Sequence, residues 1–314
     1  MFVRTLARAP LLPLLAACVS HAPVQSGAPS EEARLGVTPL QKKKAEMLTS
    51  LWENGTTVLK YAYCENIGDG RGYTSGRAGF CTGTGDALEV VRCFDASFGN
   101  GGANRLHKYL AALTVLNDRL VATGKAQADT STLDTVGPYA ADWGSSAADP
   151  STAAAFNACQ DQITSQLYFK PSLEVAKRWG LTTALTKAAL YDAEINHGPI
   201  GVDALAAKAN ADTGNAQQAP RAPLRIADES AWLRSFLGHR AATLSADKTW
   251  TEAVDRAAEY EKMRRAGNWE LAADIVTDAK AYVLFPEGGY KDSGYPVCTI
   301  RADGSVRGEP ACTK

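Results

Sequence analysis

Two carboxylates, Glu53 and Asp69, stand sixteen residues apart in this chain, and the hydroxyl of Thr74 follows. Hydrolysis of a glycosidic bond needs such a set: an acid for the leaving oxygen, a base, and a group that holds the attacking water. A general acid prefers an apolar setting, and Glu53 follows two large apolar side chains. Asp69 lies among glycines beside Arg71, which suits an ionised carboxylate. These residue types therefore indicate acid–base hydrolysis.

The elements that must position these groups are mostly helices. Thr38 and Pro39 are residue types that begin a helix, and the apolar spacing after them predicts one that ends at Glu53. The many glycines that follow exclude a helix and predict a small β region near residues 67–82. Apolar residues at helical spacing then alternate with polar loops. The predicted helices are 106–120, 153–166, 173–196 (interrupted at Gly180 and ended by His197-Gly198-Pro199), 230–244, 252–263 and 270–280; the predicted loops are 125–150 and 208–224, and the tail from Phe285 is Gly- and Pro-rich.

The first residues have the pattern of an export signal. Arg4 and Arg8 precede a short leucine-rich run that is too short to span a bilayer. Residues 15–18 resemble a bacterial lipobox, which predicts a signal peptide over residues 1–18 and lipidation of Cys18. The alternative is an ordinary secretory signal cleaved near the same point.

Composition bounds the rest of the chain. Residues 19–37 are rich in Ser, Ala and Pro and predict a flexible linker, which leaves 38–314 for the folded domain. With 45% hydrophobic and 21% charged residues the 314-residue chain is ordinary globular protein, and a net charge of -1 gives no case for nucleic acid binding. Four histidines without a His-Cys cluster argue against a zinc site, so we expect neither metal nor cofactor.

Seven cysteines fit an oxidising compartment, where the six after Cys18 would be able to pair. Six cysteines allow fifteen connectivities, so the sequence leaves the pairing open. Cys298 and Cys312 bracket a turn and predict a local staple. Cys81 is equally well read as a small buried hydrophobe.

The stretch from Glu53 to Asp86 closely resembles the signature of family 46 of the glycoside hydrolases, the chitosanases. That signature is Glu, then Asp, Asn or Gln, a spacer, Tyr, seven residues, Asp-x-Arg-Gly-x-Thr, a hydrophobe with Gly, and a final Asp. The part from the tyrosine onward is complete in this chain: Tyr61, Asp69, Arg71, Gly72, Thr74, Ala78, Gly79 and Asp86. Further landmarks of the resemblance, which spans residues 39–290, are Tyr168-Phe169-x-Pro171, Leu181-Thr182, Tyr191-Asp192-Ala193, His197-Gly198-Pro199, Asp228-Glu229 and Ala266-Gly267-Asn268.

The resemblance implies a mainly α, α+β fold of the lysozyme-like, two-lobed kind over residues 38–314, with the substrate groove between the lobes. It implies an endo-acting enzyme that hydrolyses the β-1,4 bonds of chitosan with inversion and without a cofactor. Chitosan and chitooligosaccharides would be its partners. The enzyme would be a secreted monomer, extracellular or periplasmic, attached to a membrane where Cys18 is lipidated.

The resemblance also implies individual roles. Glu53 would be the general acid and Asp69 the general base, while Thr74 would hold the attacking water. The residues that would bind substrate are Tyr63, Arg71, Asp86, Asp192, His197 and Arg240, of which Tyr63, Asp86, Asp192 and His197 would line the sugar subsites. Of these, Arg71 would lie beside Asp69, and Arg240 would pair with Asp192 in an ionic network.

Three finer expectations also come from the resemblance. Arg256 is the nearest candidate for a second arginine of the network, and a subsite acid would fall near Asp247. In some family members a cysteine at the place of Cys64 ties to a distant helix, which would make Cys159 its partner here.

The chain departs from the family signature at one point. Six residues separate Asn54 from Tyr61, about two fewer than the signature has, and Glu46 is the nearest alternative acid. Glu46 lacks the following amide and would lie inside the helix, which favours Glu53. Two alternative functions remain: a lysozyme-like peptidoglycan hydrolase and a non-catalytic chitosan-binding lipoprotein.

Overall fold

The computed structural model describes residues 36–54, 57–99, 104–215, 222–246, 253–273 and 275–276, together with the backbone of three strands at 283–286, 297–300 and 306–307. The chain divides into two compact units. Of the described residues, unit 1 comprises Lys60–Leu167 and unit 2 comprises those before and after that range. The predicted signal peptide and nearly all of the predicted linker lie outside the described residues.

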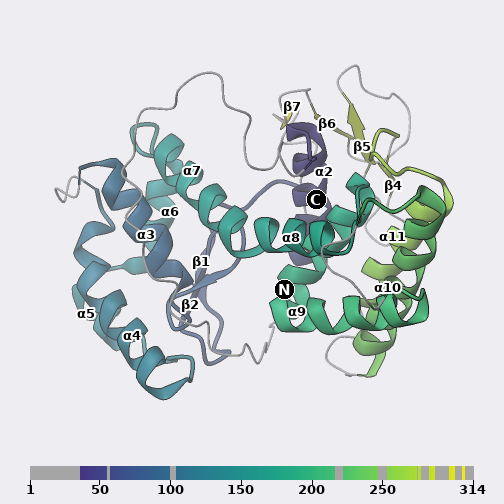
Figure 1. Cartoon of the computed structure of the whole chain (residues 1–314). Coiled ribbons are helices and arrows are strands. Elements are labelled where there is room, and N and C mark those ends of the chain that lie inside the picture. Colours follow the sequence, from purple (N-terminus) through teal and green to yellow (C-terminus); the bar gives the residue numbers. More distant parts are fainter. Residues whose placement is uncertain are drawn as a thin grey trace. The chain divides into compact units, whose positions relative to one another are not determined.

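Unit 1 is a bundle of short helices with a small antiparallel sheet (Figure 1). The sheet has the order β1-β2-β3, and its strands cover Cys64–Asn66, Tyr73–Ser75 and Phe80–Cys81. The helices are α3 (Asp86–Ser97), α4 (Leu110–Thr123), α5 (Ser131–Val136), α6 (Tyr139–Ala148) and α7 (Ala153–Thr164), with a 3-10 turn η1 (His107–Tyr109) before α4. The strands confirm the β region that the glycine spacing predicts.

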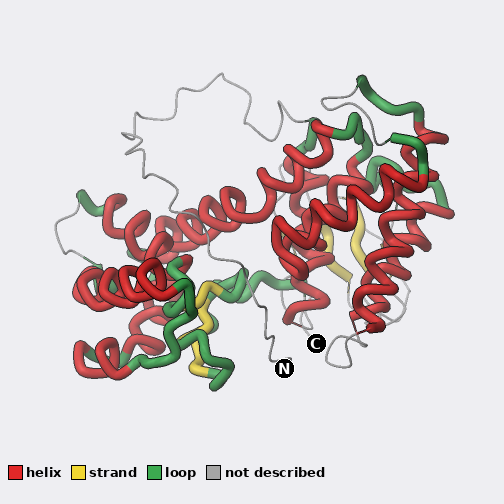
Figure 2. Tube along the Cα trace, turned by 60° about the horizontal axis from the view of Figure 1, so that its bottom comes forward, coloured by secondary structure: helices red, strands yellow, loops and turns green. Residues whose placement is uncertain are grey.

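Glycine allows the loops of unit 1 to pass close to one another; they run alongside the strands in Figure 2. Gly72 has a φ of +74°, and a side chain there would also collide with Thr82. A side chain at Gly83 would collide with the backbone of Gln127. The core beneath is aromatic, with Phe94, Trp143 and Phe156 fully buried.

Unit 2 is built around a long helix, α9 (Ala184–Asp212), against which α2 (Pro39–Asn54), α8 (Lys170–Arg178), α10 (Ile226–Ala246) and α11 (Val254–Arg265) pack. Helix α9 follows a π-helical turn η2 (Ser165–Phe169) and α8 along the chain. A four-stranded sheet of order β4-β5-β6-β7 completes the described residues, with strands Ile275–Val276, Val283–Pro286, Val297–Ile300 and Val306–Arg307. The predicted mainly α, α+β class is confirmed.

Helix α2 begins as the sequence predicts. The Thr38 hydroxyl accepts from the Gln41 N–H, and the Gln41 side chain accepts from the Thr38 N–H, so the two residues form a reciprocal capping box. The Gln41 amide also donates to the Glu270 carboxylate at 2.9 Å. The side chain of the buried Lys44 donates to the carbonyl of Leu271. These contacts join the first turns of α2 to a segment more than 200 residues away.

Several element predictions are wrong. The predicted loop 125–150 contains α5 and α6, because a few large apolar side chains, among them Leu133 and Trp143, bury short helices that look polar in sequence. The predicted end of the helical run at His197-Gly198-Pro199 is confirmed as a break in α9, because Gly198 has non-helical angles (φ +69°, ψ 174°); the sequence did not predict the second helical segment, which continues from there to Asp212. Residues 270–280 are not a helix in their described part, which turns and enters β4.

Within the described part of the chain a disulfide joins Cys93 on α3 to Cys159 on α7, so the expected Cys64–Cys159 pair is wrong. Cys64 lies on β1 opposite Ser75, and both Cys64 and Cys81 are free thiols. The expected Cys298–Cys312 staple lies outside the residues whose side chains are described.

Candidate active site

The turn before β2 holds a carboxylate against an arginine in unit 1. Arg71 donates from Nε to Asp69 Oδ2 at 2.8 Å and from Nη2 to the same oxygen at 2.5 Å. The Arg71 backbone N–H donates to the other oxygen, Oδ1, at 3.1 Å. The Asp69 side chain is buried, and Arg71 is 15% exposed. The predicted neighbours therefore do meet, through three hydrogen bonds that fix the direction of the carboxylate.

Cys81 contacts both Thr74 and Asp86. Thr74 in β2 is the cross-strand partner of Cys81 in β3, and their Oγ1 and Sγ atoms lie 3.6 Å apart. The Cys81 N–H donates to Asp86 Oδ1 at 2.9 Å, and the Thr84 hydroxyl donates to the same oxygen at 2.7 Å. Asp86 begins α3 and is almost fully buried. We call Asp69, Arg71, Thr74, Cys81 and Asp86 the Asp69 turn.

The motif tyrosine, Tyr61, has a structural place. Its hydroxyl donates to Asp161 on α7 at 2.8 Å, and its carbonyl accepts from the ring N–H of Trp143 at 3.0 Å. Arg77 lies over its ring and pairs with the same Asp161. Tyr61 therefore fastens the chain before β1 to the helices of unit 1.

A buried ion cluster lies in unit 2. Arg256 on α11 donates to both oxygens of Asp192 on α9, at 2.5 and 3.1 Å, and Arg240 on α10 donates to Asp192 Oδ2 at 2.6 Å. Arg256 also donates from Nη1 to Glu53 Oε1 at 2.7 Å. We call Glu53, Asp192, Arg240 and Arg256 the ion cluster. It contains the predicted Arg240–Asp192 pair, and Arg256 takes the place expected of a second arginine.

Charge dominates this cluster. Asp192 and Arg240 are 0% exposed, whereas the Glu53 side chain is 19% exposed. Burial alone would raise the pKa of Asp192, but the guanidinium groups of Arg256 and Arg240 outweigh it and hold that pKa well below its usual range. Burial lowers the pKa of Arg240, whereas Asp192 and Glu53 outweigh burial at Arg256 and raise its pKa. Asp192, Arg240 and Arg256 are therefore a set of buried charges, and Glu53 is the partly exposed carboxyl that Arg256 also contacts.

A second carboxylate positions the helices that carry the cluster. Glu229 on α10 is fully buried and accepts from the backbone N–H and hydroxyl of both Thr182 and Thr183, at 2.7 to 3.0 Å. Thr183 is the N-cap of α9, so this carboxylate ties the start of α9 to α10. The Glu229 and Thr182 landmarks are thus structural, and sequence reasoning did not foresee their contact.

The remaining predicted residues lie near these groups along the chain. Tyr63 is half-buried and donates to Glu65, and burial together with that carboxylate raises the pKa of Tyr63. His197 is half-buried and directly precedes the bend at Gly198 in α9. Glu46, the alternative candidate for the general acid, lies inside α2 and is buried, as the sequence analysis expects. Asp247 lies outside the described residues.

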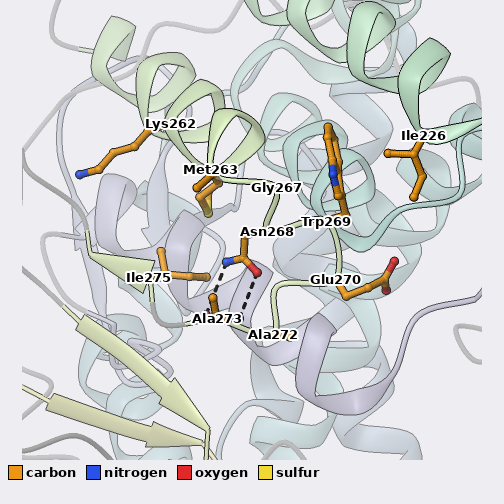
Figure 3. Close-up of a pocket in the computed structure, with 11 residues that line it drawn as sticks. Ile226, Lys262, Met263, Gly267, Asn268, Trp269, Glu270, Ala272, Ala273 and Ile275 are labelled. Atoms are coloured by element: carbon orange, nitrogen blue, oxygen red, sulfur yellow. Dashed lines mark hydrogen bonds between the residues drawn. The ribbon is translucent and has the colours of Figure 1, made fainter.

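A pocket of about 650 Å³ in unit 2 contains none of the predicted site residues (Figure 3). Trp269, Met263, Ile226 and Ile275 give it an apolar lining, and Glu270 connects it to Gln41 in the first turn of α2, whereas Glu53 is near the last. Within the described ranges, no group of three or more His, Cys, Asp or Glu side chains is arranged to bind a metal. No helix there has both the length and the apolar character that crossing a bilayer requires.

Most glycoside hydrolases use a pair of Asp or Glu carboxyl groups, and Glu53 in unit 2 and Asp69 in unit 1 are candidates for such a pair. Comparison with known proteins identifies the family. The family model of glycosyl hydrolase family 46 matches residues 47–275, and this chain belongs to that family. The fold is accordingly lysozyme-like.

The relatives of this chain are chitosanases. It is 36% identical over 260 residues to the chitosanase of Bacillus subtilis strain 168, covering 80% of this chain and 86% of that protein. The crystal structure of native chitosanase from Bacillus subtilis MY002 is similar with a TM-score of 0.63 at 34% identity, covering 78% of this chain and 98% of that one. A Gynuella sunshinyii family 46 chitosanase, solved in complex with chitotetraose, gives a TM-score of 0.62 at 29% identity, covering 79% and 98%.

Proposed function

We propose that this protein is an endo-chitosanase that hydrolyses the β-1,4 bonds between glucosamine units of chitosan with inversion of configuration. The observation that carries the proposal is membership of family 46 together with 36% identity to a chitosanase over most of both chains. The similarity to an enzyme in complex with chitotetraose supports the same substrate class. The proposed reaction needs a protonated acid, an ionised base and one water.

We assign the acid to Glu53. In the ion cluster it is the partly exposed carboxyl, and Arg256 fixes the position of its Oε1 atom. Arg256 also donates to both oxygens of Asp192, which fixes the position of its guanidinium group. A fixed acid can meet the leaving oxygen without the entropic cost of finding its position.

We assign the base to Asp69 and the water-holding group to Thr74. Three hydrogen bonds from Arg71 leave the Asp69 carboxylate one orientation. Thr74 belongs to the strand that follows this turn, five residues further on, and its hydroxyl is positioned by the sheet. In an inverting enzyme the base takes a proton from the water as its oxygen attacks the anomeric carbon.

The other predicted residues fall into two groups by their proposed roles. Asp192 is fully buried and neutralised by Arg240 and Arg256, which supports a role in holding Glu53. We propose that Tyr63, Asp86 and His197 serve the sugar subsites. Glucosamine carries a positive charge when its amine is protonated, so carboxylates at the subsites would attract it.

We further propose that the protein is exported and lipid-anchored through Cys18 by the linker 19–37, and that the catalytic domain 38–314 is a monomer with its groove between two lobes. The lipobox-like residues 15–18 support the anchor. Partition of the wild-type protein into detergent, lost in Cys18→Ser, would support lipidation. A protein recovered entirely in the aqueous phase would contradict it.

Digestion of partly acetylated chitosan, followed by NMR of the anomeric protons, tests substrate and inversion together. We expect the first products to be α-anomers and the viscosity to fall early, as endo cleavage requires. Products that begin as β-anomers would contradict inversion. Clearing of peptidoglycan without release from chitosan would support the lysozyme-like alternative, and chitosan binding without reducing ends would support the non-catalytic one.

The acid assignment has a matched control on the same helix. Glu53→Gln keeps the shape and removes the proton, and we expect kcat to fall by roughly 10²–10⁴-fold. Glu46→Gln makes the same change seven residues earlier on α2. It is expected to leave kcat within about twofold, because Glu53 keeps its proton and its position. The reverse order of the two effects would move the acid to Glu46.

A further inference from the structure

Cys81 is a buried free thiol that contacts the residue proposed to hold the attacking water. It is 1% exposed, lies in β3 directly opposite Thr74, and has its Sγ atom 3.6 Å from Thr74 Oγ1. Its backbone N–H donates to Asp86, which fixes the strand from the other side.

The hydrogen bonds of Cys81 decide the direction of the contact with Thr74. Burial, reinforced by the Asp86 carboxylate, raises the pKa of Cys81 to about 11, so the thiol keeps its single proton near neutral pH. Cys81 Sγ donates that proton to the carbonyl of Gly79 at 3.2 Å, and a carbonyl can only accept. The sulfur therefore has only lone pairs for Thr74, and the Thr74 hydroxyl must be the donor of their contact.

This direction matters for the water. A hydroxyl whose O–H donates a hydrogen bond to sulfur has its oxygen lone pairs directed elsewhere, and a water can donate to them. The same water can donate its second proton to a carboxylate base. Its own lone pair is then the group left to attack the anomeric carbon, as inversion requires.

We infer that Cys81 is a positioning residue for the proposed hydrolysis. It accepts a hydrogen bond from the Thr74 hydroxyl and so leaves the Thr74 oxygen free to accept one from the attacking water. This inference rests on the proposed function, in which Thr74 holds that water. The chain of donors runs from the water to Thr74, from Thr74 to Cys81 and from Cys81 to Gly79. Cys81 itself touches neither the sugar nor the water.

Cys64 provides a matched control in the same sheet. It is also a free thiol whose pKa burial raises, to about 12, and it also contacts a hydroxyl of β2, that of Ser75, at 3.2 Å. Successive residues of a strand point to opposite faces, so the Cys64–Ser75 pair lies on the other face of β2 from Thr74. Loss of this thiol removes a comparable contact without reaching the proposed water.

The test is a double-mutant cycle on chitosan with kcat, KM and the melting temperature measured for each folded variant. We expect Cys81→Ala to lower kcat about tenfold with KM within about twofold, Cys81→Ser to keep most of the wild-type kcat, and Cys64→Ala to match the wild type. In a Thr74→Val background, where the hydroxyl is absent, Cys81→Ala is expected to cause no further loss. If Cys81→Ala does not fold, Cys81→Val removes the same acceptor with the volume restored.

Two results would overturn the inference. One is wild-type kcat in a folded Cys81→Ala or Cys81→Val variant. The other is losses from Cys81 and Thr74 that multiply, because a purely structural thiol would act regardless of the hydroxyl. A wild type inactive on chitosan would overturn the proposed function as well, so the two failures are distinguishable.

Discussion

Glu53 and Asp69 are each held by an arginine, but the two arginines come from very different places in the chain. Arg71 is two residues from Asp69, in the same turn. Arg256 is 203 residues from Glu53 and reaches it from another helix. The Asp69 turn is therefore a local structure, whereas the ion cluster exists only when α2, α9, α10 and α11 have packed. The position of Asp69 therefore depends on the conformation of one turn, whereas the position of Glu53 depends on the packing of four helices.

The ion cluster should be the costlier one to break. Asp192→Asn leaves the two buried arginines without their counter-charge, and we expect the free energy of unfolding to fall by about 3–5 kcal/mol. Asp203 lies on the same helix and pairs with Arg178 at 2.9 Å, but both side chains are exposed. Asp203→Asn should therefore cost less than about 1 kcal/mol. Urea unfolding of the two variants measures the contrast, and equal losses would contradict a buried cluster.

In unit 1 a covalent link joins two helices. The Cys93–Cys159 bond spans 66 residues and joins α3 to α7. Replacing both cysteines by alanine should lower the free energy of unfolding by about 2–4 kcal/mol, since the unfolded chain regains the freedom of that loop. Urea unfolding under the same conditions measures it. A double variant as stable as the wild type would show that packing alone holds unit 1.

Much of the Asp69 turn could be predicted from sequence because its geometry is local. Asp69, Arg71 and Thr74 keep their spacing in any structure that forms this turn, and a motif records that spacing. The ion cluster is not local: the family resemblance names the Arg240–Asp192 pair and Arg256 as the nearest second arginine, but no spacing in the sequence shows that Arg256 also reaches Glu53. For the same reason the disulfide partner was wrong, since pairing depends on which helices touch.

The helices in 125–150 were missed for a different reason. Their composition is polar, and only a few residues, such as Leu133, Tyr139 and Trp143, are buried. Three large side chains are enough to bury a short helix but too few to produce a helical period in sequence. The described part of 270–280 shows the converse: residue types that favour a helix enter strand β4, where Ile275 pairs with Leu284 and Val276 with Val283.

Acid should weaken the ion cluster in a defined direction. The pKa of Asp192 is depressed in the folded state, so its contribution to stability is complete above the unfolded pKa of about 3.9 and is lost as the pH falls below that value. Relative to Asp192→Asn, the wild type should lose about 1.4 kcal/mol per pH unit once the pH is below that of the unfolded carboxyl. Urea unfolding of both proteins at pH 7, 4 and 3 measures the difference. A difference that is constant with pH would mean that Asp192 is not held ionised.

The smallest expected effect separates structure from chemistry within the motif. Tyr61→Phe removes the hydroxyl that donates to Asp161 but keeps the ring under Arg77. We expect a loss of about 1 kcal/mol in the free energy of unfolding, the usual net worth of one hydrogen bond, and an unchanged kcat on chitosan. Thermal unfolding and initial rates of the same preparation measure both. A large fall in kcat with intact stability would contradict this prediction and give Tyr61 a role in the reaction. The expected result means that one residue of the family signature is structural: Tyr61 holds the segment before β1 against α7.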